Sequence, residues 1–197
     1  MIKVIAFDFG GVLGSDADEW NTTFKKVLDK SGLTVSEMFN IWEKYWPTLK
    51  LGKGNIMDYW VEAAKKNGVT PKTLREIYNQ SIRIDNDVLK IAKSLKRKYK
   101  LIILSNDTKD WMDAKIKRFK FDKIFDKVYS SANLGISKPN RKIFDYVLRD
   151  LKIKPQELIF IDNQENNYEA ARDMEINTIL FKSSIQLKKE LSSLLPH

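Results

Sequence analysis

The stretch that decides the fold is residues 2–13, IKVIAFDFGGVL, an apolar run that ends at Asp8 and is followed by two glycines. A short run rich in Val, Ile and Phe is typical of a strand buried on both faces of a parallel sheet. Gly10 and Gly11 let the backbone turn back toward the carboxylate, so that N–H groups of the loop can converge on an anion. Asp8 is therefore predicted to be a nucleophile or a metal ligand.

The composition bounds the chemistry that this chain can perform. Its 197 residues, 43% hydrophobic and 31% charged, are enough for one compact domain with an insertion. The sequence has no cysteine, and its one histidine is His197. These absences exclude disulfides, zinc-thiolate sites, and Ser-His-Asp, Cys-His and histidine-metal chemistry. Carboxylates, lysines, hydroxyls and amides remain as the reactive groups.

The net charge of +9 favours a lysine-rich solvated surface over a nucleic-acid site. Apart from concentrations in 93–100 and 109–127, the basic residues are spread over expected helices, for example Lys25, Lys65, Lys115, Lys142 and Lys188. No zinc finger, RNP-like pattern or basic zipper accompanies them. No apolar run is long enough to span a bilayer, and the N-terminal run is too short for a signal peptide. We therefore expect a cytoplasmic protein, monomeric or homodimeric, with no membrane or nucleic-acid partner.

Strands and helices are expected to alternate beyond the first strand. Four more apolar runs predict strands, and three amphipathic patterns between them predict helices. The strands are Leu101–Leu104, Val128–Tyr129, Leu158–Ile161 and Thr178–Phe181, and the helices are Thr108–Arg118, Pro139–Leu151 and Gln164–Met174. Such alternation predicts an α/β fold with a doubly wound, mostly parallel sheet, whose site lies off the carboxyl ends of the strands.

Residues 15–85 break this alternation and are predicted to form an inserted helical domain, between core segments 1–14 and 86–197. Its helix starts are a Thr34–Glu37 capping box, Asn55 and Thr70-Pro71. It holds four of the five tryptophans, Trp20, Trp42, Trp46 and Trp60. These are expected to fill its own core, with one or two available as walls of a substrate pocket. Lys50 and Lys53 are expected to be solvated rather than in contact with an anionic substrate.

Three polar signals follow expected core strands. Ser105-Asn106 can donate hydrogen bonds to an oxyanion, and Lys138 can neutralise a carboxylate together with a phosphoryl group. Asp162-Asn163 can bind a hard cation through oxygen atoms. Each signal alone is equally an ordinary turn, a helix cap or a surface lysine. All three signals follow expected strands, and this shared position supports a common functional site.

The order FDFGGVL, LSN, SKPNRKIF and FIDNQENNYEAAR resembles the four motifs of the haloacid dehalogenase-like hydrolase superfamily. The resemblance spans nearly the whole chain, and the insertion looks like the helical cap of the superfamily's first cap class. It implies that Asp8 is the nucleophile and that Ser105 and Asn106 bind the transferring phosphoryl group. It also implies that Lys138 offsets charge at Asp8 and the phosphate, and that an aspartyl-phosphate forms and is hydrolysed by water.

The resemblance further implies Mg²⁺, bound by Asp8, Asp162 and the backbone carbonyl of Gly10, with Asn163 reaching the ion through water. Gly10 and Asn163 are also departures from the family, because many of its phosphatases carry Asp at both positions. An Asp in place of Gly10 would transfer protons, which contributes about 10² to 10⁴ in rate. We therefore expect slow turnover, or a preference for good leaving groups such as acyl or anomeric sugar phosphates.

Asp16 or Asp18, at the entrance to the insertion, is a candidate replacement for the missing acid, although both residues are equally helix caps. The leading hypothesis is a Mg²⁺-dependent phosphatase acting on a small phosphorylated metabolite. A metal-independent 2-haloacid dehalogenase is one alternative, although those relatives use an early arginine and the first arginine here is Arg75. A binding or regulatory protein with weakened catalysis is the other.

Overall fold

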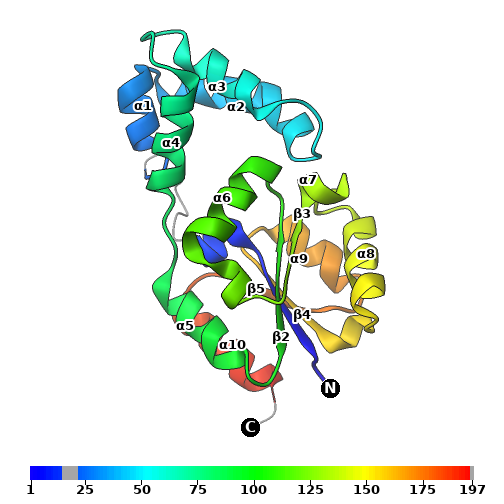
Figure 1. The fold of residues 1–197 in the computed structure, drawn as a ribbon. Coiled ribbons are helices and arrows are strands. Elements are labelled where there is room, and N and C mark those ends of the chain that lie inside the picture. The colour runs from blue at the N-terminus through cyan, green and yellow to red at the C-terminus, as the bar shows by residue number, and fades with distance from the viewer. Residues whose placement is uncertain (15–21, 196–197) are drawn as a thin grey trace.

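The computed structural model describes residues 1–14 and 22–195 (Figure 1). The expected start of the insertion, together with Asp16, Asp18, Trp20 and His197, lies outside the described residues. Among the described residues, none of the helices has the length and apolar character needed to cross a membrane.

Five parallel strands form one sheet in the order β3-β2-β1-β4-β5. They are β1 (Val4–Phe7), β2 (Lys100–Ser105), β3 (Lys127–Ser130), β4 (Leu158–Asp162) and β5 (Asn177–Leu180). Phe7 pairs with Ile103 on one side and Ile161 on the other, so the last residue of β1 lies within two residues of the ends of β2 and β4. The prediction of a doubly wound parallel sheet is confirmed, and all four strand pairings are parallel.

Side chains alternate between the two faces of β1, and each face has its own layer of helices. Ile5 and Phe7 pack with α5 (Asn86–Leu95), α6 (Lys109–Phe119) and α10 (Ser184–Leu194). Val4 and Ala6 pack on the opposite face with α8 (Arg141–Leu151) and α9 (Glu165–Arg172). Complete burial of both faces explains why β1 is apolar throughout rather than alternating in polarity.

Short elements connect these layers. They are η1 (Phe9–Leu13), η2 (Phe121–Lys123), α7 (Ser131–Leu134) and η3 (Pro155–Glu157). The helix predicted from Pro139 begins instead at Arg141, because the side chain of Asn140 accepts a hydrogen bond from the N–H of Lys142 and caps the helix there.

Four helices lie beyond the carboxyl edge of the sheet (Figure 1). They are α1 (Lys25–Ser31), α2 (Val35–Leu49), α3 (Ile56–Ala64) and α4 (Pro71–Ser81). The predicted caps form, since Thr34 and Glu37 make a capping box and Asn55 accepts a hydrogen bond from the N–H of Met57. The chain leaves the core and returns side by side, because Gly14 bridges Ile84 in antiparallel fashion.

One aromatic residue of the core joins the aromatic cluster of these helices. Trp111, on α6, lies with its ring centroid 4.6 Å from that of Tyr78 and 6.1 Å from that of Trp60. Trp60 is fully buried, as the expectation of a tryptophan-filled core requires. A single apolar cluster therefore runs from the helices 25–81 into the α/β layers.

A backbone contact also fixes the loop after α2 against the core. Gly52 has φ +71°, and a Cβ at this position would lie 2.2 Å from the carbonyl oxygen of Ala132 in α7. Because the obstacle is backbone and the φ is left-handed, this position requires glycine. The neighbouring Lys50 is consequently held close to the sheet's carboxyl edge.

Candidate active site

Asp8 stands where β1 ends, and its backbone N–H donates to the carbonyl oxygen of Ile161 in β4 (2.9 Å). The loop that follows depends on one of its two glycines. Gly11 has φ +73°, a conformation that L side chains rarely adopt, and a Cβ there would lie 2.4 Å from Nδ2 of Asn163, so the Asn163 amide would also have to move. Gly10 has φ −65° and ψ 116°, a conformation open to any residue. The predicted turn toward the carboxylate thus rests on Gly11 alone.

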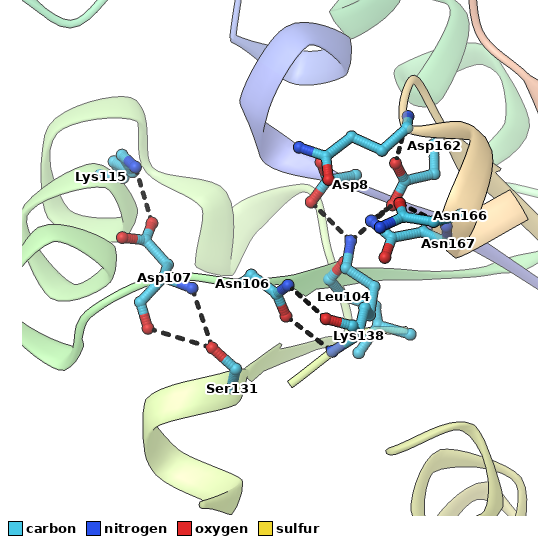
Figure 2. Close-up of polar contacts among 11 residues, drawn as sticks. Asp8, Leu104, Asn106, Asp107, Lys115, Ser131, Lys138, Asp162, Asn166 and Asn167 are labelled. Carbon is cyan, nitrogen blue, oxygen red and sulfur yellow. Dashed lines mark hydrogen bonds and ion pairs between the residues drawn. The ribbon is translucent and has the colours of Figure 1, made fainter. Parts of the chain in front are cut away.

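Lys138 is the centre of the site (Figure 2). Its ammonium donates to Oδ1 of Asp8 (2.8 Å), Oδ2 of Asp162 (2.7 Å) and the carbonyl oxygen of Leu104 (2.8 Å). Its side chain is 1% exposed, so all three donors are used inside the protein. The two carboxylate oxygens contact one nitrogen and are therefore close to each other. The loop feeding α8 thus brings its lysine between the ends of β1 and β4.

Asp162 is fully buried and holds several donors at once. Its Oδ1 accepts from the N–H of Gln164 (2.8 Å), and its Oδ2 accepts from Nδ2 of Asn167 (3.1 Å) as well as from Lys138. Burial and the nearby charge of Asp8 raise the pKa of Asp162, against the opposing effect of Lys138. Burial acts to lower the pKa of Lys138, but the charges of Asp8 and Asp162 outweigh it and leave that pKa raised.

The residues around this pair of carboxylates fit a hard divalent cation. Two carboxylates meet one ammonium, so the group carries an excess negative charge when all three are ionised. Oδ1 of Asn167, in a residue 2% exposed, has no hydrogen-bond partner among the described residues. Carboxylate and amide oxygens are the ligands that Mg²⁺ takes in proteins. The described residues contain no cluster of three or more acidic, histidine or cysteine side chains, so amide, backbone or water oxygens would complete the set.

Asn106 contacts the lysine loop rather than facing the site as a free amide. Its Oδ1 accepts from the N–H of Lys138 and its Nδ2 donates to the carbonyl oxygen of the same residue, both at 2.9 Å. This reciprocal pair fixes the backbone that carries the ammonium. The neighbouring Ser105 ends β2 and is 2% exposed, on the edge of the cavity above Asp8. Both residues line that cavity, as their predicted contact with a phosphoryl group requires.

The cavity has a volume of about 470 Å³, the size of a small-molecule site. Its core side is formed by Asp8, Ser105, Asn106, Lys138 and the amides that begin α9, among them Asn163. Its other side is formed by Trp42, Trp46 and Lys50 of the α2 segment. Two tryptophans therefore face the site, the larger number that the sequence allowed. Lys50 is half-buried in the cavity wall, whereas Lys53 is exposed.

A second buried ion pair lies beside the site. Nζ of Lys115 lies 2.6 Å from Oδ2 of Asp107 and 4.2 Å from the ring centroid of Phe9, and both charged side chains are under 10% exposed (Figure 2). The expectation that Lys115 belongs to the solvated surface is therefore wrong. Asp107 lies two residues before α6, whereas Lys115 lies within that helix, so their pairing depends on how the loop before α6 folds, which composition alone does not indicate.

Comparisons with known proteins agree with this fold. The sequence model of the family described as haloacid dehalogenase-like hydrolase matches residues 5–181. The chain is similar to bifunctional epoxide hydrolase 2 of Rattus norvegicus, with 30% identity over 216 residues that cover 96% of this chain and 38% of that protein. It thus spans less than half the length of that relative.

Two further comparisons cover nearly the full length of both proteins. The D-ribitol-5-phosphate phosphatase of Bacteroides thetaiotaomicron is 26% identical over 211 residues, 99% of each chain. A crystal structure of an enzyme of the family from the same organism, in complex with magnesium and inorganic phosphate, superposes with a TM-score of 0.76, at 26% identity and over 92% of this chain and 95% of that one. Because the family match covers most of the sequence and the fold agrees, this chain belongs to the haloacid dehalogenase-like hydrolase family.

Proposed function

We propose that this hydrolase is a Mg²⁺-dependent phosphatase that acts on a small phosphorylated metabolite through an aspartyl-phosphate on Asp8. The observation that carries the proposal is the ammonium of Lys138, bonded to both Asp8 and Asp162 at the floor of a metabolite-sized cavity. The Bacteroides phosphatase, similar over its full length, supports the same reaction class. In this proposal residues 15–85 form a helical cap, which covers the leaving-group side of the cavity.

The proposed reaction has two steps. A carboxylate oxygen of Asp8 forms a bond to phosphorus while the bond from phosphorus to the ester oxygen breaks, so the leaving group departs as an alkoxide that takes a proton from water. Water then hydrolyses the acyl phosphate and restores the carboxylate. Lys138 holds Asp8 in position and offsets negative charge, while the Ser105 hydroxyl donates to a phosphoryl oxygen. Asp8, Asp162 and the carbonyl of Gly10, with Asn163 through water, would hold Mg²⁺, which when bound would neutralise charge on the phosphoryl group.

Apart from Asp8, no described residue in the cavity lining has a carboxyl group that could protonate the leaving group. Among the described residues that line the cavity, the titratable side chains are those of Asp8, Lys50 and Lys138. Asp8 is the proposed nucleophile, and Lys138 uses its donors within the site. The leaving group would then depart without a carboxylic acid from the described part of the chain, which favours esters with good leaving groups.

A panel of phosphate esters assayed with Mg²⁺ is the direct test. We expect hydrolysis of p-nitrophenyl phosphate and of acyl or anomeric sugar phosphates, with loss of activity in EDTA and recovery when Mg²⁺ is added in excess. Phosphate release is the measurement. Hydrolysis that continues unchanged in EDTA would remove the metal from the proposal, and inactivity across the panel would favour a binding or regulatory role.

The dehalogenase alternative is tested by halide release from 2-haloacids in EDTA. We expect none, because Arg75, the first arginine of the chain, is absent from the cavity lining and its Nε donates to Oδ2 of Asp110 (2.8 Å). An arginine held in an ion pair on α6 is not placed to bind a substrate carboxylate. Metal-independent halide release would replace the phosphatase proposal with this one.

Gly10→Asp is expected to increase turnover of esters with poor leaving groups. The backbone at Gly10 accepts any residue, and the only atom within 4 Å of an added Cβ is Oδ2 of Asp8, at 4.0 Å. A carboxyl group at this position can protonate the leaving oxygen, so we expect about a tenfold gain, a fraction of the full effect of acid catalysis. Steady-state kinetics on an alkyl phosphate and on p-nitrophenyl phosphate measure it.

The control is Gly10→Asn, which has the same size but no transferable proton. We expect the gain only in the Asp variant and mainly on the alkyl phosphate, because p-nitrophenolate leaves without protonation. Equal rates in the two variants would mean that position 10 takes no part in proton transfer here.

A further inference from the structure

Lys50 is a cation in the wall of the catalytic cavity without an acidic partner. It follows the last residue of α2 and is half-buried, and its ammonium makes no ion pair or hydrogen bond with the rest of the described chain. The fully buried lysines that the structure describes are different, because Lys115 pairs with Asp107 and Lys138 pairs with two carboxylates. An ammonium in the cavity wall that has no acidic partner is available to pair with an anionic ligand.

The aromatic wall beside Lys50 offers ring edges rather than ring faces. Along α2, Phe39 stacks on Trp42 at a centroid distance of 5.7 Å and an interplanar angle of 26°, and Trp42 stacks on Trp46 at 5.2 Å and 18°. Trp46 in turn lies near-parallel to Trp111, at 6.4 Å and 22°. Each indole of the cavity wall therefore has two near-parallel aromatic neighbours, which compete with a ligand for its faces and leave its edge more available.

Ring edges carry the positive part of the aromatic quadrupole. The cap side of the cavity thus presents an ammonium and two indole edges, and none of its described lining residues is acidic. A ligand group placed there is favoured if it is negative and compact. A nucleobase or an aryl ring would bind there less favourably, because stacking requires an open ring face.

Lys50 is also separated from the phosphoryl site by the architecture. Asp8 and Lys138 come from the carboxyl edge of the sheet, whereas Lys50 comes from the helical segment on the other side of the cavity. The close contact of Gly52 with Ala132 holds that segment against the core. A phosphoryl group bound at Asp8 would therefore direct its leaving group toward Lys50.

We infer that Lys50, flanked by the edges of Trp42 and Trp46, binds a second anionic group carried by the leaving group of the substrate. The substrate class is a compact organophosphate with a carboxylate or a second phosphoryl group a few bonds from the scissile ester. This inference rests on the proposed phosphatase function and adds to it which phosphate esters the site selects.

The test compares non-hydrolysable phosphonates that differ in the charge of the group at the other end of a three-carbon chain. Calorimetric titration in Mg²⁺ gives the affinities of 3-phosphonopropionate, propane-1,3-bisphosphonate and the neutral-tailed propylphosphonate. We expect wild-type protein to bind at least one dianionic-tailed or carboxylate-tailed ligand about tenfold more tightly than propylphosphonate, the low end for a hydrogen bond to a charged group. Which of the two is tighter identifies the second anion as carboxylate or phosphoryl.

Variants then assign the selectivity to Lys50. In Lys50→Met, which keeps the unbranched side chain, the tenfold ratio should fall to near one. In Lys50→Arg, which keeps the charge, most of the ratio should remain. Lys53→Met removes a neighbouring exposed lysine and should leave the ratio as in wild type. Thermal unfolding of each variant controls for loss of the fold.

Two outcomes overturn the inference. One is wild-type protein that binds all three phosphonates equally, and the other is Lys50→Met protein that keeps the full ratio. The proposed function is tested separately, by measuring the hydrolysis of p-nitrophenyl phosphate by wild-type protein. Selective binding without hydrolysis would sustain the subsite and remove the phosphatase activity, whereas hydrolysis without selectivity would do the reverse.

Discussion

Asp8→Asn is expected to lower phosphate-ester hydrolysis by about 10⁴-fold or more, the scale on which removal of a covalent nucleophile acts. The amide has the size of the carboxylate but is neutral, and its oxygen is a poor nucleophile for phosphorus. Asp8 is 6% exposed and already holds an ammonium hydrogen bond, so the substitution keeps the packing of the β1 end. Initial rates with Mg²⁺, on the best ester of the panel, measure the loss.

The same variant carries its own control for folding. Asp8 and Asp162 share one ammonium, and the charge of Asp8 contributes to the raised pKa of Asp162. Removing one of the two negative charges leaves a matched pair of Lys138 and Asp162. We therefore expect the midpoint of chemical unfolding to be preserved while activity is lost. Activity that survives at more than a few per cent would assign the nucleophile to another residue.

The sequence predicted the sheet and its site because each motif is local. An apolar run ending in a polar residue marks the end of a buried strand, and parallel strands bring their carboxyl ends to one edge. Asp8, Ser105 and Asp162 therefore meet for reasons readable from three separate short segments. The helix caps at Thr34 and Asn55 were readable in the same way, since a cap involves residues two or three apart.

The sequence does not predict contacts between distant segments. The amide of Asn106 bonds to the backbone of Lys138, 32 residues away, and nothing in either segment specifies that partner. The burial of Lys115 and the placement of Trp111 among the rings of helices 25–81 depend likewise on how α6 packs. Periodicity tells which side of a helix is buried, but not which residues it meets.

Lys50 shows the same limit for function. The charge of a lysine next to a Gly-Lys-Gly segment alone indicates no ligand. The proposed role of Lys50 depends on the backbone contact at Gly52, which holds the segment beside the candidate site. That contact joins α7 to a loop about 80 residues earlier in the chain, beyond the reach of any local pattern.

Lys138→Met is expected to reduce the free energy of unfolding by about 3–5 kcal/mol, the range for removing one partner of a buried ion pair. The methionine side chain has a similar length, so the main loss is electrostatic. It leaves the carboxylates of Asp8 and Asp162 facing each other in a site that is almost fully buried. Urea unfolding in EDTA measures the loss, and catalysis should fall as well because the charge that balances Asp8 is gone.

The electrostatic origin of that loss can be separated from cavity formation by a second substitution. Asp162→Asn in the Lys138→Met background removes one of the two repelling charges, so the double variant should be more stable than Lys138→Met alone. Mg²⁺ should likewise raise the unfolding midpoint of Lys138→Met more than that of wild type, because a cation would replace the missing positive charge between the two carboxylates. If the double variant is less stable and Mg²⁺ has no larger effect, packing around the lysine stem, rather than charge balance, is what Lys138 contributes to the fold.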